Sequence, residues 1–251
     1  MDEGVAVLAQ QHAELAALID GLDDEGWARP SRCEGWTVAD VVLHLSQTDE
    51  MALASAEHRL GEYSARATEG LGPIGDVDDL ADAMVAKERG RPGPEVGERW
   101  REGAARVRAA LQAGDPHDRV DWVAGKLSLR TLATTRLAEA WIHSGDVAFA
   151  SGGTWSATDR LGPIARLAWR TLPYAFSRAG EELHGPVAFE LTVPGGPALS
   201  FSGDEPAATT VRGPARDLCL VAARRLEPSD TELEAEGPDA ERVLALVRTY
   251  A

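Results

Sequence analysis

The chain has 251 residues, 44% of them hydrophobic and 26% charged, which is enough for one large domain or two modest ones. Its formal charge of −16 repels phosphate backbones and anionic lipids, so we expect neither nucleic acid nor a membrane surface as a partner. No run approaches the roughly 18–20 apolar residues of a spanning helix, and the N-terminus is acidic where a signal peptide would be basic, so we expect a cytoplasmic protein.

The first half of the chain predicts long helices. Apolar residues recur there at steps of three and four, the spacing of one helix face. Thr37 and Asp40 form a capping-box pattern that opens one of these helices. Helices are expected over residues 5–22, 37–63, 77–112 with a break at GRPGPE, and 127–150. Four long helices joined by short connections predict a four-helix bundle.

The second half changes character after the stretch SGGTWSATDR. A helix over 158–179 comes first, and short β-rich runs separated by glycine turns follow it, in PVAFELTV, ALSFSG and ATTVRG. Two more helical stretches are expected in PARDLCLVAARRL and DAERVLALVRTYA. The predicted fold class is therefore α+β, with a helical-bundle domain over 1–154 and a smaller α+β domain over 155–251.

The two cysteines, Cys33 and Cys219, lie far apart in the sequence and lack CxxC spacing. A disulfide framework and a thiolate zinc cluster are therefore not expected. Each cysteine is expected to be a buried or half-buried packing residue, because only accessible thiols with a perturbed pKa react readily.

The helix expected over 127–150 mixes charged and apolar residues on one side. At 100° per residue, that side collects Leu132, Arg136, Glu139, Ala140, His143, Asp146 and Val147. A solvated face would not normally carry these apolar residues. A core face would not normally hold four ionisable groups unless they satisfy one another or bind a metal.

A metal site can be assembled from this face and one residue of an earlier helix. Glu139 and His143 are one turn apart, so their side chains can converge on one atom. With His44 they give two imidazoles and a carboxylate, which suits an open Zn²⁺ site with three protein ligands. The competing interpretation is a surface ion pair and a packed His44. His12, on the apolar face of the first helix, is expected to be a core histidine.

Two stretches resemble a known family. The run Gly35-Trp36-Thr37, with Asp40 and His44 behind it, and the later Arg136, Glu139, His143 and Asp146 resemble the mycothiol-dependent maleylpyruvate isomerase and DinB-like family of actinobacteria. The C-terminal half also resembles a branch of this family, so the resemblance covers nearly the whole chain. It implies a four-helix bundle in which His44, Glu139 and His143 bind a divalent metal, usually zinc. Ser144 departs from the glycine that commonly follows the second histidine.

The resemblance further implies that the metal acts on a small thiol, mycothiol, which adds to a small electrophilic substrate. It implies that an arginine of the C-terminal domain holds an anionic substrate, which points to Arg224 or Arg225, although both could simply flank a helix end. Asp146 could orient a ligating imidazole, and Arg136 could neutralise Glu139 or bind an anionic group. Trp36 and Trp141 could line the pocket, although core packing is the usual role of tryptophan in a bundle.

Three functions remain open at this point. The first is a zinc-dependent thiol transferase or isomerase. The second keeps the metal but activates water or a carbonyl without a thiol. The third is a ligand-binding module with a structural metal, which would normally need a fourth protein ligand, such as His12. The substrate, the native metal and the choice between monomer and homodimer are not specified.

Overall fold

The computed structural model describes residues 3–123 and 125–249. The chain divides into two compact units, Met1–Trp155 and Ser156–Ala251, and each is described by itself. Within the described residues, no helix combines the length and the apolar composition needed to cross a membrane. The fold confirms the predicted class, a helical N-terminal part followed by an α+β part.

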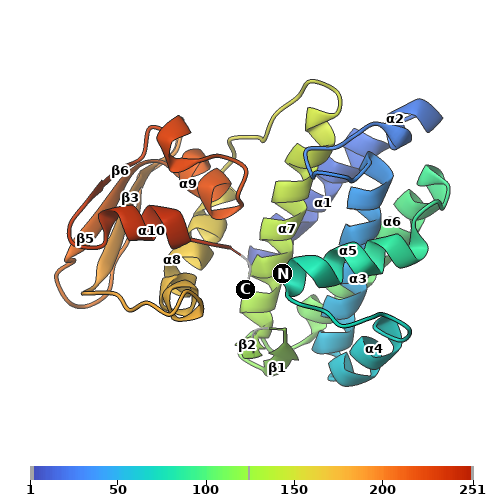
Figure 1. The fold of residues 1–251 in the computed structure, drawn as a ribbon, viewed down its shortest axis with the longest axis horizontal. Coiled ribbons are helices and arrows are strands. Elements are labelled where there is room, and N and C mark those ends of the chain that lie inside the picture. The colour runs from blue at the N-terminus through green and yellow to red at the C-terminus, as the bar shows by residue number, and fades with distance from the viewer. Residues whose placement is uncertain (1–2, 124, 250–251) are drawn as a thin grey trace. The chain divides into compact units, whose positions relative to one another are not determined.

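The helical unit is built on four long helices (Figure 1). These are α1 (Glu3–Ile19), α3 (Val38–Ala56), α6 (Gly93–Ala113) and α7 (Leu129–Phe149). Helix α3 packs against α6 and α7, and α1 packs against the same two helices, so the four enclose one core. The shorter helices α2 (Asp24–Ala28), α4 (Leu60–Ala67) and α5 (Val77–Glu88) flank the bundle.

Helix α3 starts where the sequence predicts. The hydroxyl of Thr37 accepts a hydrogen bond from the Asp40 amide at 3.2 Å, and the Asp40 carboxylate accepts one from the Thr37 amide at 2.9 Å. This capping box satisfies two amides that the first helical turn leaves unpaired.

The end of α3 differs from the prediction. A single helix to Tyr63 was expected, but α3 ends at Ala56, and His58 takes a left-handed backbone conformation with φ of 57°. Helix α4 then folds back, and the Tyr63 hydroxyl donates to the Gln47 carbonyl at 2.8 Å. Burial of Tyr63 against α3 compensates for the break, which neither glycine nor proline marks in the sequence.

A short hairpin precedes α7 and was not predicted. Strands β1 (Arg119–Trp122) and β2 (Gly125–Ser128) pair antiparallel, and Ser55 of α3 donates to the Asp121 carbonyl at 2.6 Å. Ser128 then caps α7 by accepting from the Thr131 amide at 3.2 Å. The hairpin and this cap fix where α7 begins.

The C-terminal unit has a mixed sheet with helices packed on it. Strands β3 (Val187–Thr192) and β5 (Thr209–Pro214) run parallel at the centre of the order β4-β3-β5-β6. The antiparallel edges are β4 (Leu199–Phe201) and β6 (Glu234–Glu236), the second of which was not predicted. The helices are α8 (Leu161–Arg178), α9 (Ala215–Ala222), the 3₁₀ turn η1 (Pro228–Asp230) and α10 (Ala240–Leu246). The last predicted helix reached residues 250–251, which lie outside the described residues.

Candidate metal centre

Three side chains from two facing helices meet inside the helical unit. Nε2 of His44, on α3, lies 3.5 Å from Oε2 of Glu139, on α7, and Nε2 of His143 lies 3.6 Å from the same oxygen. The two imidazole rings are 5.0 Å apart, centre to centre. One ligand atom from each residue lies within 4.8 Å of the others, a set that could hold a metal ion. The structure thus brings together the three residues that the helix face and the resemblance selected.

The electrostatics of this group follow from its burial, since the side chains are only 10–18% exposed. Burial raises the pKa of Glu139, but hydrogen bonding with His143 and His44 outweighs it and holds that pKa well below the usual value. Burial, together with the charges of His143 and Arg136, lowers the pKa of His44. The group therefore keeps an ionised carboxylate between two imidazoles, and a cation can bind to this combination.

The other ring nitrogen of His143 has a different environment. Nδ1 lies 2.9 Å from Oδ2 of Asp146, whose side chain is fully buried. Cys33 reaches the same oxygen, with its Sγ 3.2 Å away and 3.9 Å from Nδ1 of His143. These three residues form a second set whose ligand atoms could hold a metal ion. Burial lowers the pKa of His143, but hydrogen bonds with Asp146, Cys33 and Glu139 outweigh it and raise that pKa well above the usual value.

Cys33 is the site residue that sequence reasoning missed. It was expected to pack as a half-buried side chain, and it is half-buried, but its thiol donates to a buried carboxylate. Only its position three residues before the Trp36-Thr37 capping segment, which carries α3, could have drawn attention to it.

Trp36, in the loop before α3, packs beside His44. Its ring lies 5.1 Å from that of His44, centre to centre, at an angle of 54°. Its Nε1 donates to Asp82 of α5 at 2.7 Å. Trp141, the second tryptophan predicted to line the pocket, is 1% exposed on α7, as a core residue would be.

Arg136 is buried one turn before Glu139, and its guanidinium stacks 5.1 Å above the ring of Trp122. Among the residues that the structure describes, its Nε and Nη1 have no hydrogen-bond partner, and neither does Oδ2 of Asp49 on α3. Burial raises the pKa of Asp49 to about 7, although the charge of Arg136 opposes this. The bundle thus holds further buried charge beside the ligand set.

His12 is a core histidine, as predicted. It is 4% exposed, its ring packs edge-on against Trp100, and its Nδ1 accepts from Arg108 at 2.6 Å. Burial and the nearby charges of Arg108 and Arg136 lower its pKa to about 3, so it is neutral near pH 7. Among the described residues, it belongs to neither potential metal set.

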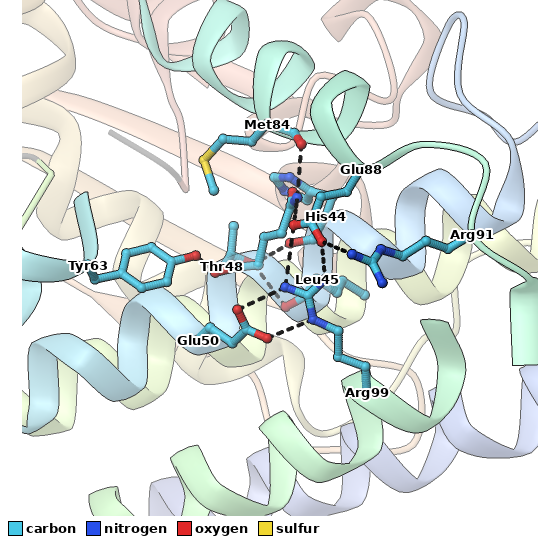
Figure 2. Close-up of polar contacts among 10 residues, drawn as sticks. His44, Leu45, Thr48, Glu50, Tyr63, Met84, Glu88, Arg91 and Arg99 are labelled. Carbon is cyan, nitrogen blue, oxygen red and sulfur yellow. Dashed lines mark hydrogen bonds and ion pairs between the residues drawn. The ribbon is translucent and has the colours of Figure 1, made fainter. Parts of the chain in front are cut away.

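A polar network on α3 holds α5 beside the centre, and Figure 2 shows its contacts. Arg99 of α6 donates to Glu50 at 2.8 Å and to Glu88 of α5 at 2.7 Å. The amide of Gln47, also on α3, donates to the Met84 carbonyl at 2.9 Å and to Glu88 at 3.0 Å. The helix that carries Asp82, the partner of Trp36, is thereby fixed to the helix that carries His44.

Two further predictions concern Ser144 and Arg224. Ser144 donates to the Ala140 carbonyl at 2.6 Å and accepts from Gln11 at 3.0 Å, and α7 continues unbroken through it. Arg224 follows α9 in the C-terminal unit, is exposed and has φ of 59°. Arg225 donates to the Ala223 carbonyl at 2.9 Å, as an arginine flanking a helix end would.

Fold and site together define a four-helix bundle with a potential metal centre between facing helices, followed by an α+β domain. Comparison with known proteins agrees with this description. Residues 8–148 match the family model described as mycothiol maleylpyruvate isomerase N-terminal domain, and residues 164–243 match the MDMPI C-terminal domain. The chain therefore belongs to the mycothiol maleylpyruvate isomerase family.

Individual relatives fit the same assignment. Uncharacterized proteins from two strains of Mycobacterium tuberculosis are 33% identical over 252 residues, which cover 98% of this chain and 95% of theirs. Crystal structures of the mycothiol-dependent maleylpyruvate isomerase and of a mutant superpose with a TM-score of 0.62 over 95% of both chains. At 17–18% identity, this likeness shows a shared fold.

Proposed function

We propose that this protein is a cytoplasmic enzyme that binds a divalent metal ion, zinc by preference, through His44, Glu139 and His143. Its reaction is the transfer of a small thiol, such as mycothiol, to a small electrophile, or the isomerisation of that electrophile. The observation that carries the proposal is the convergence of three ligand atoms from α3 and α7 within 4.8 Å. Membership of the family supports the thiol, because a relative of the same fold is a mycothiol-dependent isomerase.

The residues fit such a metal. Tetrahedral zinc with bonds of about 2.0–2.1 Å to nitrogen and oxygen separates its ligand atoms by about 3.3 Å. The distances of 3.5 and 3.6 Å from Glu139 to the two histidines are close to this value. Two imidazoles and one carboxylate also leave a coordination position open, as catalytic zinc sites do.

A bound zinc ion with an open position would coordinate the sulfur of a thiol and lower its pKa, making it nucleophilic at neutral pH. The chain's own groups prepare this chemistry. Asp146 accepts a hydrogen bond from Nδ1 of His143 and so directs Nε2 towards the ligand set. Arg136 balances the charge of Glu139, and Trp36 shields His44 from water.

Arg224, Arg136 and Trp141 have different proposed roles around the substrate. Arg224, exposed after α9, is proposed to hold an anionic group of the substrate. Arg136 is better suited to neutralising Glu139, because its Nε and Nη1 are fully buried. Trp141 is proposed to support the wall of the site through packing, in keeping with its exposure of 1%.

Metal content tests the ligand set. We expect about one zinc per chain in protein purified without a metal column, measured by plasma mass spectrometry, and its loss in His44→Ala. His117→Ala, which removes an exposed histidine of the same unit, is the matched control and should keep the metal. Wild-type protein that takes up no metal when zinc is added would refute the proposal.

The role of the thiol is tested separately, with zinc-loaded protein, mycothiol and a halonitrobenzene. The thiol proposal predicts conjugation that depends on the metal and disappears in Glu139→Gln. Metal binding without conjugation would favour activation of water or a carbonyl. A coordination shell with a fourth protein ligand would favour a structural metal in a binding module.

A further inference from the structure

The loop between α2 and α3 brings Cys33 to α7 in a fixed position. Ser31 and Trp36 close the loop, with the Ser31 amide donating to the Trp36 carbonyl at 2.9 Å and the Trp36 amide donating to the Cys33 carbonyl at 3.1 Å. The Ser31 hydroxyl accepts from the Cys33 amide at 3.1 Å. The Arg32 amide donates to the Asp146 carbonyl at 3.4 Å, which ties the loop to α7. These backbone hydrogen bonds fix the position of Cys33, so its thiol points towards Asp146.

The thiol and the imidazole share one acceptor. Oδ2 of Asp146 lies 3.2 Å from Sγ of Cys33 and 2.9 Å from Nδ1 of His143. One carboxylate oxygen has two lone pairs and can accept from both donors. Because Asp146 is fully buried, its charge is stabilised by such donors and not by bulk water. A thiol is a weak donor, but a hydrogen bond to an ionised acceptor in a dry interior is stronger than the same bond in water.

From this geometry, we propose that Cys33 is a positioning residue for the metal ligand His143 and that it acts through Asp146. The proposal rests on the proposed function. The thiol donates to Oδ2, which keeps the carboxylate turned towards His143. The carboxylate then holds the ring with its proton on Nδ1, and Nε2 is presented to Glu139 at 3.6 Å.

A second arrangement of the same atoms competes with this one. Cys33, Asp146 and Nδ1 of His143 could themselves bind a cation. That arrangement requires Nδ1 to give up its proton, whereas the 2.9 Å contact with Asp146 is the length of a hydrogen bond from that proton. The hydrogen-bonded arrangement needs no second ion, and the cation-bound arrangement becomes an outcome of the test.

The test is a double-mutant cycle on metal affinity. Zinc affinity of the whole chain is measured by competition with a chromogenic chelator for wild type, Cys33→Ala, Asp146→Asn and the double variant. Loss of a partner behind a metal ligand commonly weakens binding about 10–100-fold, and we expect about tenfold for Cys33→Ala. Cys33→Ser, which restores a donor, should recover most of the affinity. Cys219→Ala, in the other unit, is the control and should match wild type.

Each outcome decides the proposal. Cys33→Ala should weaken zinc binding in the wild-type background and have little further effect beside Asp146→Asn, because the thiol acts through that carboxylate. Equal losses in both backgrounds, or full affinity in Cys33→Ala, would overturn the proposal while leaving the metal site intact. Absence of zinc binding by wild type would overturn the proposed function and this inference together.

Cobalt substitution separates the second arrangement. Cobalt bound by two histidines and a glutamate should give visible bands without an intense near-ultraviolet sulfur-to-cobalt transition. We expect that pattern in wild type, and changed visible bands in Cys33→Ala. A sulfur-to-cobalt transition that disappears in Cys33→Ser would mean that Cys33 is itself a ligand, and would overturn the positioning role.

Discussion

The two units of the chain have different interiors. Among the described residues, the aspartate, arginine and histidine side chains that are buried in the helical unit are His12, Asp40, Asp49, Arg136, His143 and Asp146. In the C-terminal unit, Asp239 is the corresponding case, and both its carboxylate oxygens accept from His184, one from the backbone amide and one from the ring. Burying a charge costs free energy unless it is paired, and within the described residues atoms of Arg136 and Asp49 have no hydrogen-bond partner, so this interior is not what stability alone would favour. The helical unit therefore carries a cost in stability beside its candidate metal centre, whereas the buried carboxylate of the C-terminal unit is paired.

Removing a core side chain from the C-terminal unit should have the largest effect. Phe189 on β3 is fully buried, and Phe189→Ala should lower the free energy of unfolding by about 3–5 kcal/mol, through lost burial and the cavity left behind. Urea unfolding followed by circular dichroism measures the change. Tyr174→Ala, at a residue 38% exposed in the same unit, is the control. Similar losses in both variants would contradict a well-packed C-terminal core.

Neutralising a buried charge in the helical unit should instead stabilise the protein. The folded-state pKa of Asp49 is raised to about 7 by burial, so its proton stabilises the fold fully below about pH 4, and this stabilisation is lost as the pH rises to 7. Asp49→Asn keeps the neutral form at every pH. Near pH 8, with a chelator present, it should therefore be about 2–4 kcal/mol more stable than wild type.

The pH dependence makes this prediction specific. Near pH 4 the advantage of Asp49→Asn should nearly vanish, because wild type is then protonated at the same site. Asp204→Asn, which removes an exposed carboxylate, should differ from wild type by less than about 0.5 kcal/mol at both pH values. A gain for Asp49→Asn that is the same at both values would show that burial of its charge is not the cause.

A smaller effect is expected at Gly145, where α7 packs against Trp155. A Cβ at Gly145 would lie 1.9 Å from the ring of Trp155, whose Nε1 donates to the Ile142 carbonyl. Gly145→Ala should therefore cost about 1–3 kcal/mol in urea unfolding. At Gly103, in α6, the added carbon would meet no described residue outside its own stretch of helix within 4 Å, so Gly103→Ala should stabilise by about 0.5–1 kcal/mol. A neutral Gly145→Ala would mean that this side of the site is loosely packed.

The smallest effect should come from charges on the surface of the C-terminal sheet. Arg212 on β5 pairs with Glu190 of β3 at 2.8 Å and with Glu236 of β6 at 3.4 Å, and all three side chains are largely exposed. Arg212→Gln should cost less than about 1 kcal/mol, and high salt should remove the difference. A larger cost that persists in salt would mean that the stability of this unit also depends on its charges.

The parts of the fold that the sequence predicts are those with local signals. The capping box at Thr37 and Asp40 places the start of α3, and apolar spacing locates the four long helices. The break at His58 has no such signal, because its φ of 57° belongs to a residue other than glycine. Strand β6 reads Glu-Ala-Glu and has no apolar face of its own, since its place comes from pairing with β5.

The candidate site divides in the same way. Glu139 and His143 can be found from one helix face, because they are one turn apart, whereas His44 comes from an earlier helix and from the resemblance. Cys33 cannot be found in this way, because it lies 113 residues from Asp146 in sequence, and only the folded loop joins them. The effect of the Arg136 charge on the pKa of Asp49 likewise depends on contact between α7 and α3, which their sequences do not show.

The closed loop before α3 has a practical consequence for protein design. A designer who copies only α3 and α7 into another helical bundle would transfer His44, Glu139 and His143, but would leave behind the segment that presents Cys33 and Trp36. Such a graft would reproduce the candidate ligands without the side chains that contact them. The smallest portable unit is therefore the loop from Pro30 to Thr37 together with both helices.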